Sequence, residues 1–172
     1  MEAAGDGTDE VAGAHEPRWL NEGEQRSWRA FVESSGGVIQ LLDGLLKRDA
    51  SITFDDYEVL VQLSEAEGRR MRMTDLSTRL LHSQSRVTQR IDRLECRGWV
   101  QREKSNADRR VTFAVLTDAG QEAIEAAAPV HVGHVREHFL DLLEPDEVEV
   151  LGALLHRLLV HVRELRGEHP QH

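Results

Sequence analysis

The residues of this 172-residue sequence best suited to chemistry are short polar side chains and arginines between positions 83 and 97. At 100° per residue along a helix, Ser85, Gln89 and Asp92 share one face, and Thr88 lies beside it. Four arginines flank that face: Arg86, Arg90, Arg93 and Arg97. Hydroxyl and amide groups bond base edges in the major groove of DNA, and guanidiniums bond phosphates. The alternative is an ordinary amphipathic helix with a solvated arginine face.

A helix must position these side chains, and the sequence predicts both of its ends. Ser83 suits the N-cap because its hydroxyl accepts a hydrogen bond from a first-turn N–H. Gly98 suits the position after the last turn, where φ becomes positive. Val87, Ile91 and Leu94 are spaced four and three apart and form an apolar stripe that would face the core. A shorter helix is predicted over 73–81, so the pair has the order of a helix-turn-helix, whose second helix enters the major groove.

A two-stranded hairpin is predicted after the second helix, with strands over 99–104 and 111–116. Residues 70–73 are predicted to pair beside it as a short third strand. Arg109 and Arg110 would lie at the hairpin tip, and Asp108 would pair with Arg110 and hold it extended. The negative potential of a narrow minor groove attracts guanidinium groups. The hairpin therefore predicts a DNA-binding wing, with a solvated loop as the alternative.

Several segments of the chain resemble the multiple-antibiotic-resistance regulator (MarR) family. Asp108-Arg-Arg110, followed by Leu116-Thr-Asp-Ala-Gly120, is similar to the family's signature from the wing into the next helix. Residues 56–60 and 93–100 match other characteristic segments, and the resemblance runs from about Arg18 to about Val162. It implies a winged helix-turn-helix fold, mainly α with a small β wing. It also implies a homodimeric repressor or activator, often released from DNA by a small phenolic ligand, an oxidant or a metal.

The charge distribution agrees with a DNA-binding module inside an acidic protein. The whole chain carries a net charge of −10, but residues 69–110 contain 12 Lys and Arg against 5 Asp and Glu. A basic region on an acidic body gives a focused surface for phosphates. No apolar run approaches the roughly 20 residues of a membrane span, and a single cysteine permits no internal disulfide. We therefore expect a cytoplasmic protein that contacts no membrane.

The predicted organisation centres on the DNA-binding domain, residues 51–117. An acidic extension over 1–17 and a dimerisation helix over 18–50 precede it, and dimerisation helices over 118–166 and a tail over 167–172 follow. The last helix carries an apolar seam at three- and four-residue spacing: Val148, Leu151, Leu155, Leu158, Val162 and Leu165. The first helix carries a similar stripe, and one small winged helix cannot cover both. A homodimer would cover them and would place two recognition helices on a pseudo-palindromic operator.

A ligand cleft is expected between the dimerisation helices and the winged helix. Its candidate residues are Trp28, Tyr57, Val59 and His131. A small aromatic effector that binds there is predicted to release the DNA, and no cofactor is expected to be required.

The sequence also contains candidates for a zinc site and for a reactive cysteine. His131, His134 and His138 lie at i, i+3 and i+7, a spacing with which imidazoles bind zinc, so a zinc-responsive regulator is the alternative. The same histidines would otherwise line the cleft or face solvent. Cys96 lies near Arg93 and Arg97, which would lower its pKa and make it reactive, whereas the alternative is an inert thiol.

The sequence lacks the motifs of common enzyme classes, such as a glycine-rich phosphate loop or a Gly-x-Ser-x-Gly turn, so no catalytic function is predicted. We expect a DNA-binding repressor instead. The residues expected at base edges are Ser83, Gln84, Ser85, Thr88, Gln89 and Arg93. Arg86 and Arg90 are expected to contact phosphates or to fix the helix, and Arg109 and Arg110 to enter the minor groove. The alternative is a winged helix that binds a protein and no longer contacts DNA.

Overall fold

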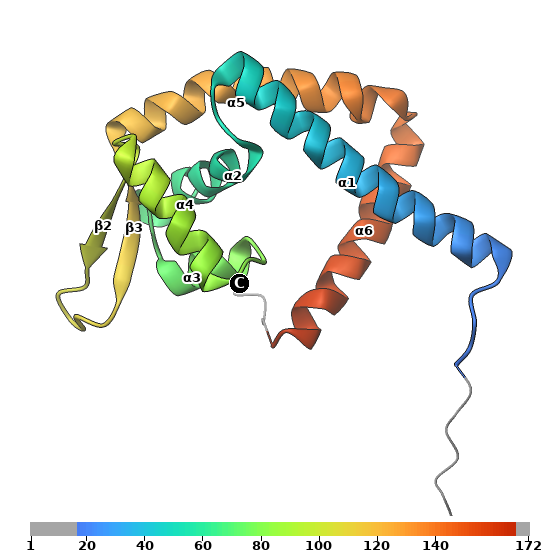
Figure 1. The fold of residues 1–172 in the computed structure, drawn as a ribbon, viewed down its shortest axis with the longest axis horizontal. Coiled ribbons are helices and arrows are strands. Elements are labelled where there is room, and N and C mark those ends of the chain that lie inside the picture. The colour runs from blue at the N-terminus through green and yellow to red at the C-terminus, as the bar shows by residue number, and fades with distance from the viewer. Residues whose placement is uncertain (1–16, 168–172) are drawn as a thin grey trace, which may run out of the picture. The chain divides into compact units, whose positions relative to one another are not determined.

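The computed structural model describes residues 17–167, which form mainly helices and a small antiparallel sheet (Figure 1). This architecture confirms the predicted fold class. In chain order the elements are α1 (Glu22–Ala50), α2 (Phe54–Ser64), the 3-10 turn η1 (Glu67–Arg69), β1 (Arg70–Arg72), α3 (Met73–Arg79), α4 (Gln84–Cys96), β2 (Val100–Lys104), β3 (Thr112–Leu116), α5 (Asp118–His138), the 3-10 turn η2 (Leu140–Leu142) and α6 (Pro145–Leu165).

The described chain divides into two compact units at Ser35, which lies within α1. The first unit holds the start of α1, where Asn21 and Glu24 cap each other. Asn21 Oδ1 accepts from the Glu24 N–H at 2.9 Å, and Glu24 Oε2 accepts from the Asn21 N–H at 2.8 Å. The second unit holds all the other elements. The predicted extension over 1–17 and tail over 167–172 lie outside the described residues, apart from positions 17 and 167.

The sheet has three strands in the order β1-β3-β2, and both pairings are antiparallel. The predicted third strand is confirmed, since Met71 pairs with Ala114. Gly120, at the start of α5, packs directly on the beginning of the hairpin. A Cβ atom built at that position would lie 2.1 Å from the Trp99 carbonyl oxygen, so only glycine fits. This contact fixes the first turn of α5 against the base of the wing.

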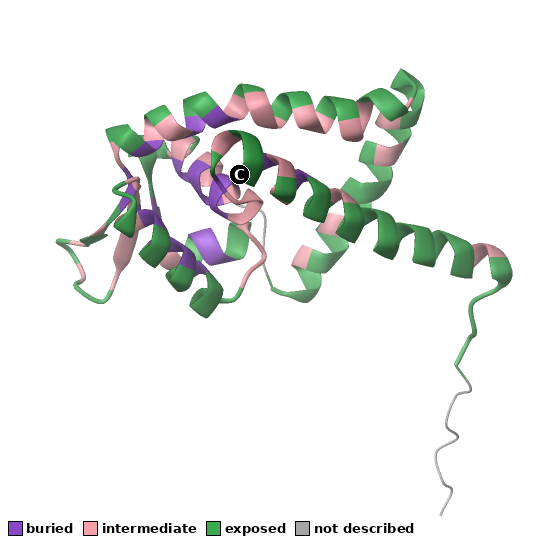
Figure 2. Cartoon of the chain, turned by 45° about the horizontal axis from the view of Figure 1, so that its top comes forward, coloured by how far each residue is buried: buried purple, intermediate pink, exposed green. Residues whose placement is uncertain are grey.

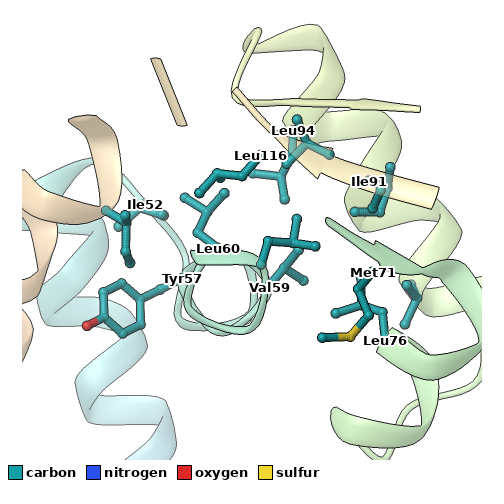
Figure 3. Close-up of a cluster of buried hydrophobic side chains, with 14 of the residues drawn as sticks. Ile52, Tyr57, Val59, Leu60, Met71, Leu76, Ile91, Leu94 and Leu116 are labelled. Atoms are coloured by element: carbon teal, nitrogen blue, oxygen red, sulfur yellow. The ribbon is translucent and has the colours of Figure 1, made fainter. Parts of the chain in front are cut away.

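The main core joins α2, α3, α4 and the sheet of the winged helix (Figure 3), and it extends to Leu46 of α1 and to Ile124 and Ala127 of α5. Val59, Leu60, Leu76, Ile91 and Leu94 are fully buried in it. The predicted inward stripe of the second helix is therefore confirmed. The proposed cleft role of Val59 is wrong, because its side chain is fully enclosed by the core and reaches no cleft.

Helix α6 has no buried residue, whereas each helix of the winged helix has buried residues (Figure 2). Leu154, Leu155, Leu158 and Val162 are among its large apolar side chains exposed to solvent. Exposed apolar side chains also run along α1, where Trp28, Phe31, Val32, Ile39 and Leu41 are open. A single chain leaves these apolar surfaces uncovered.

Candidate nucleic-acid interface

Helices α3 and α4 form the predicted helix-turn-helix, and the predicted ends of α4 are present. Ser83 Oγ accepts from the Arg86 N–H at 3.4 Å, which caps the first turn. Gly98 has φ +72° just after the helix, as its predicted position requires. In the turn between the helices, the His82 N–H donates to the Ser77 carbonyl at 3.0 Å. Local hydrogen bonds thus fix the point at which α4 begins.

The outward face of α4 carries the polar side chains that the sequence placed there. The exposed residues of its first two turns, with the cap, are Ser83, Gln84, Ser85, Thr88 and Gln89. The hydroxyls of Ser83 and Ser85 lie 3.1 Å apart and bond each other. These groups offer both donors and acceptors on one helix face. Arg86 is also exposed and adds a guanidinium beside them.

Arg90 lies in a different environment from Arg86, although the same two roles were predicted for both residues. Its side chain is only 3% exposed and lies 2.5 Å from Asp55 of α2. Its Nη1 atom also bonds His82 Nδ1 at 2.9 Å. Burial, together with the positive charge of Arg90, lowers the pKa of His82 and favours its neutral form. The prediction that Arg90 contacts a phosphate is therefore wrong. The enclosed guanidinium instead attaches α4 to α2, the alternative role predicted for Arg90.

Two other arginines of the predicted flank are also tied to the domain. Arg93 donates from Nη2 to Asp56 of α2 at 3.0 Å, while 54% of its side chain remains exposed. Arg97 donates to the Ser51 carbonyl at 3.0 Å, and its guanidinium lies over the Trp99 ring at 3.5 Å. The arginine flank of the sequence is thus partly a set of attachments between α4 and its neighbours.

The hairpin tip carries the predicted arginine pair. Arg109 is exposed, and the side chain of Arg110 is 91% exposed. Asp108 Oδ1 accepts from the Arg110 backbone N–H at 3.0 Å and from its Nε at 3.2 Å. These bonds from Arg110 hold the pKa of Asp108 below its usual value, so the carboxylate stays charged and orients the guanidinium. The predicted pair between Asp108 and Arg110 is present.

Arg102 is a residue that sequence analysis missed. It points from β2 to α4, where its guanidinium contacts Glu95 and lies 2.8 Å from Asp92. It also donates to the Thr88 carbonyl at 3.1 Å, and its backbone N–H donates to Glu95 at 2.9 Å. These bonds attach the wing to the recognition helix. A groove of about 380 Å³ lies beside this attachment, lined by residues that include Arg72, Thr74, Gln84, Thr88, Arg102 and Arg110.

The residues predicted for a ligand cleft separate in the structure. The rings of Tyr57 and His131 lie 4.4 Å apart, and Phe54 lies 5.8 Å from the same imidazole. His131 Nδ1 is buried without a hydrogen-bond partner among the described residues, and burial lowers the pKa of this histidine. Trp28 belongs to the other compact unit. The pair formed by Tyr57 and His131 is thus what remains of the predicted cleft.

The three predicted zinc ligands do not form one cluster. The group of possible metal ligands found among the described residues is His134, Glu137 and His138, and it leaves out His131. The ring of His131 lies against Tyr57 instead, with the two ring planes tilted by 47°. The predicted set of ligands is therefore wrong in one member, because Glu137 takes the place of His131.

Cys96, the other candidate reactive group, is exposed at the end of α4.

Within residues 17–167, no helix is long and apolar enough to cross a membrane. Family and structural comparisons relate the chain to known proteins. The MarR family profile matches residues 52–112. The structure is similar to that of AbsC, a MarR family transcriptional regulator from Streptomyces coelicolor, with 42% identity and a TM-score of 0.80, covering 86% of this chain and 99% of AbsC. It is also similar to Sco3205, another MarR family regulator from that organism, solved in complex with DNA. That match has 39% identity and a TM-score of 0.81, and covers 84% of this chain and 91% of Sco3205.

Curated sequence relatives are more distant and are also named as regulators. The regulator YkoM of Bacillus subtilis is 34% identical over 94 residues, 55% of this chain and 60% of YkoM. The transcriptional repressor MprA of Escherichia coli is 30% identical over 105 residues, 59% of this chain and 60% of MprA. The chain thus spans 60% of the length of these curated relatives. Their names describe transcriptional regulators and not enzymes.

Proposed function

The chain belongs to the MarR family, and from that premise we propose that it is a transcriptional regulator that binds double-stranded DNA as a homodimer. The observation that carries the proposal is the exposed polar face of α4, with the guanidinium of Arg86 beside it. Its capping bond and its ties to α2 and β2 hold that face in one position. A fixed helix of this kind suits insertion into the major groove.

The contacts follow from which side chains are open. We assign Ser83, Gln84, Ser85, Thr88 and Gln89 to base edges, because hydroxyls and amides can donate and accept there. Arg93 is assigned to the edge of the same face, since half of its side chain is exposed although one amino group bonds Asp56. Arg86 is assigned to a phosphate.

The wing supplies a second contact. Arg109 and Arg110 lie at the tip of the hairpin, and Asp108 holds Arg110 through backbone and side-chain bonds. A guanidinium whose direction is already fixed loses less conformational entropy when it enters a narrow minor groove. Arg102 sets the position of this wing relative to α4.

The homodimer is supported by the apolar surface that one chain leaves open. Helix α6 has no buried residue and exposes Leu155, Leu158 and Val162 at the predicted seam. We assign a second copy of the chain as the partner, because a two-fold contact covers the same patch on both copies. Two copies of α4 would then address half-sites about 34–36 Å apart on a pseudo-palindromic operator.

Regulation is proposed to follow the pattern of a repressor released by a small aromatic molecule. The related MprA of Escherichia coli is named a transcriptional repressor. The rings of Tyr57 and His131 provide an apolar contact, and the buried His131 Nδ1 lacks a protein partner among residues 17–167. An effector with an aromatic ring and one polar group would match these features.

Selection of bound sequences from random duplexes by the purified protein tests this function. We expect an inverted repeat with half-site centres about one helical turn apart. Affinity for the selected duplex should fall steeply with salt, since phosphate contacts release counterions. A protein that selects no sequence and shows no salt-dependent affinity for DNA would instead be a winged helix that binds protein.

A further inference from the structure

The C-terminal end of α5 carries imidazole and carboxylate groups that the proposed DNA-binding function does not use. One ligand atom from each of His134, Glu137 and His138 lies within 4.8 Å of the other two. The rings of His134 and His138 stack with centroids 6.0 Å apart, as expected for positions four apart on one helix face. We infer that these three side chains bind one divalent transition-metal ion, with zinc the ion that best suits them.

Asp49, near the C-terminal end of α1, holds the ring of His134. His134 Nε2 lies 2.9 Å from Asp49 Oδ2, and Arg48 bonds the same carboxylate at 2.6 and 2.7 Å. An imidazole that binds a metal usually gives its second ring nitrogen to a carboxylate, which fixes its tautomer and direction. Asp49 fills that role and leaves the other nitrogen of His134 for the ion. The site therefore attaches the end of α1 to α5, within one compact unit.

Electrostatics and access also favour a cation at this position. Helix α5 ends at His138, so its last carbonyls and the negative end of its dipole lie beside the cluster. The side chain of His134 is 14% exposed and that of His138 is 28% exposed, so an ion can enter from solvent. Glu137 is more open and can turn toward the ion. Three protein ligands leave a fourth tetrahedral position for water.

The ligand types select the class of metal. Two imidazoles and one carboxylate suit zinc and neighbouring transition metals, whereas magnesium and calcium take oxygen ligands. This set differs from the one predicted by sequence, because Glu137 replaces His131. Neighbouring turns of a helix bring Glu137 to His134 and His138, while the His131 ring is directed onto Tyr57.

Metal titration of chelator-treated protein without a histidine tag tests the site directly. Calorimetry with Zn²⁺ should give one ion per chain, and Co²⁺ should give the visible absorption of a tetrahedral complex. His134→Gln and His138→Gln should each weaken binding at least about tenfold, because even the partner behind a ligand contributes about 10–100-fold. Asp49→Asn should weaken it within that range. His131→Gln is the matched control and should leave affinity unchanged.

The measurement needs no DNA, so its outcome is separate from that of the proposed DNA-binding function. A double replacement of His156 and His161 by Gln, on α6, should retain the ion. Far-UV circular dichroism of the metal-free variants should match that of the wild type. The inference is overturned if the wild type binds no zinc stoichiometrically, binds calcium more tightly than zinc, or gives an octahedral Co²⁺ spectrum. It is also overturned if His131→Gln abolishes binding while Glu137→Gln retains it.

Discussion

The different environments of Arg86 and Arg90 lead to a prediction that separates phosphate contact from helix support. Both are arginines on α4, but Arg86 is exposed, whereas the side chain of Arg90 is 3% exposed, forms an ion pair with Asp55 and bonds His82. Replacing each by methionine keeps an unbranched side chain and removes the charge. Only Arg86→Met should remove a phosphate contact, because only that guanidinium is open to a ligand.

The size of the effect follows from counterion release. Each phosphate contact contributes about 0.9 to the slope of log affinity against log salt concentration. In a homodimer, Arg86→Met removes two contacts and should reduce the slope by about 1.8. Between 50 and 200 mM salt, the variant should therefore lose about 12-fold less affinity than the wild type. Arg90→Met should leave the slope unchanged. Fluorescence anisotropy with a labelled operator, at several salt concentrations, measures both slopes.

Arg90 should instead affect the free energy of unfolding, in a way that depends on which partner is removed. Asp55→Ala leaves the enclosed guanidinium without its carboxylate and should cost about 1–3 kcal/mol. This is below the full penalty for a broken buried pair, since the Asp55 side chain is 43% exposed. Arg90→Met leaves the carboxylate, which water can reach, and should cost less. Urea unfolding at a fixed protein concentration makes the comparison. Equal reductions in salt slope for the two methionine variants would refute this argument, as would a larger loss of stability for Arg90→Met than for Asp55→Ala.

Three further predictions concern the wing, the dimer and pH. Arg110→Ala should weaken operator binding by about 1–3 kcal/mol without loss of helix content, and an unchanged affinity in gel shifts would contradict the minor-groove assignment. Leu155→Glu should dissociate the dimer in light scattering because it buries an unpaired charge, whereas Ala153→Glu, on the opposite face of α6, should not. Burial lowers the pKa of both His82 and His131 below the ordinary value for histidine, about 6.5. As the pH falls through that value, the unfolded chain therefore binds more protons than the folded chain. The free energy of unfolding should fall between pH 7 and 5, and His82→Gln or His131→Gln should reduce that fall.

The elements with strong local signals could be predicted from the sequence alone. The ends of α4 follow from Ser83 and Gly98, since each residue performs a backbone task that few others can. Its inner face follows from the apolar spacing of Val87, Ile91 and Leu94. The pair at the hairpin tip, Asp108 and Arg110, was also predictable because the two residues are only two positions apart in sequence. In each case the deciding interactions are local along the chain.

The remaining features depend on contacts between distant segments. Arg90 and Arg86 look alike in sequence, and only the packing of α2 against α4 encloses Arg90 beside Asp55. Val59 lies two residues from Tyr57, yet it turns into the core while Tyr57 meets His131. The pairing of Arg102 with Glu95 was hard to predict, since the two residues are seven positions apart and lie on different elements joined by a turn. Helical spacing alone could not separate His131 from the other two histidines, because its contact with the Tyr57 ring involves a distant segment of the chain.

The ion pairs of α2 and β2 also decide which positive charges remain for DNA. Asp55 and Asp56 of α2 form ion pairs with Arg90 and Arg93. Glu95 forms an ion pair with Arg102. These pairs use some of the arginines of a net basic segment for structural support. A helix held by paired arginines binds all sequences less strongly through phosphates, so the polar groups at base edges have more influence on which sequence is bound.

Helix α2 is also the element that joins this support to the proposed effector contact. On one side its Asp55 and Asp56 hold α4, and on the other its Tyr57 lies against His131 of α5. A molecule that separates the two rings must move α2 or α5, and a movement of α2 changes the position of α4. An effector that binds the displaced arrangement 100-fold more tightly would supply about 2.7 kcal/mol toward release. That energy is comparable with one specific base contact, so a modest preference at the rings is enough to reduce operator binding markedly.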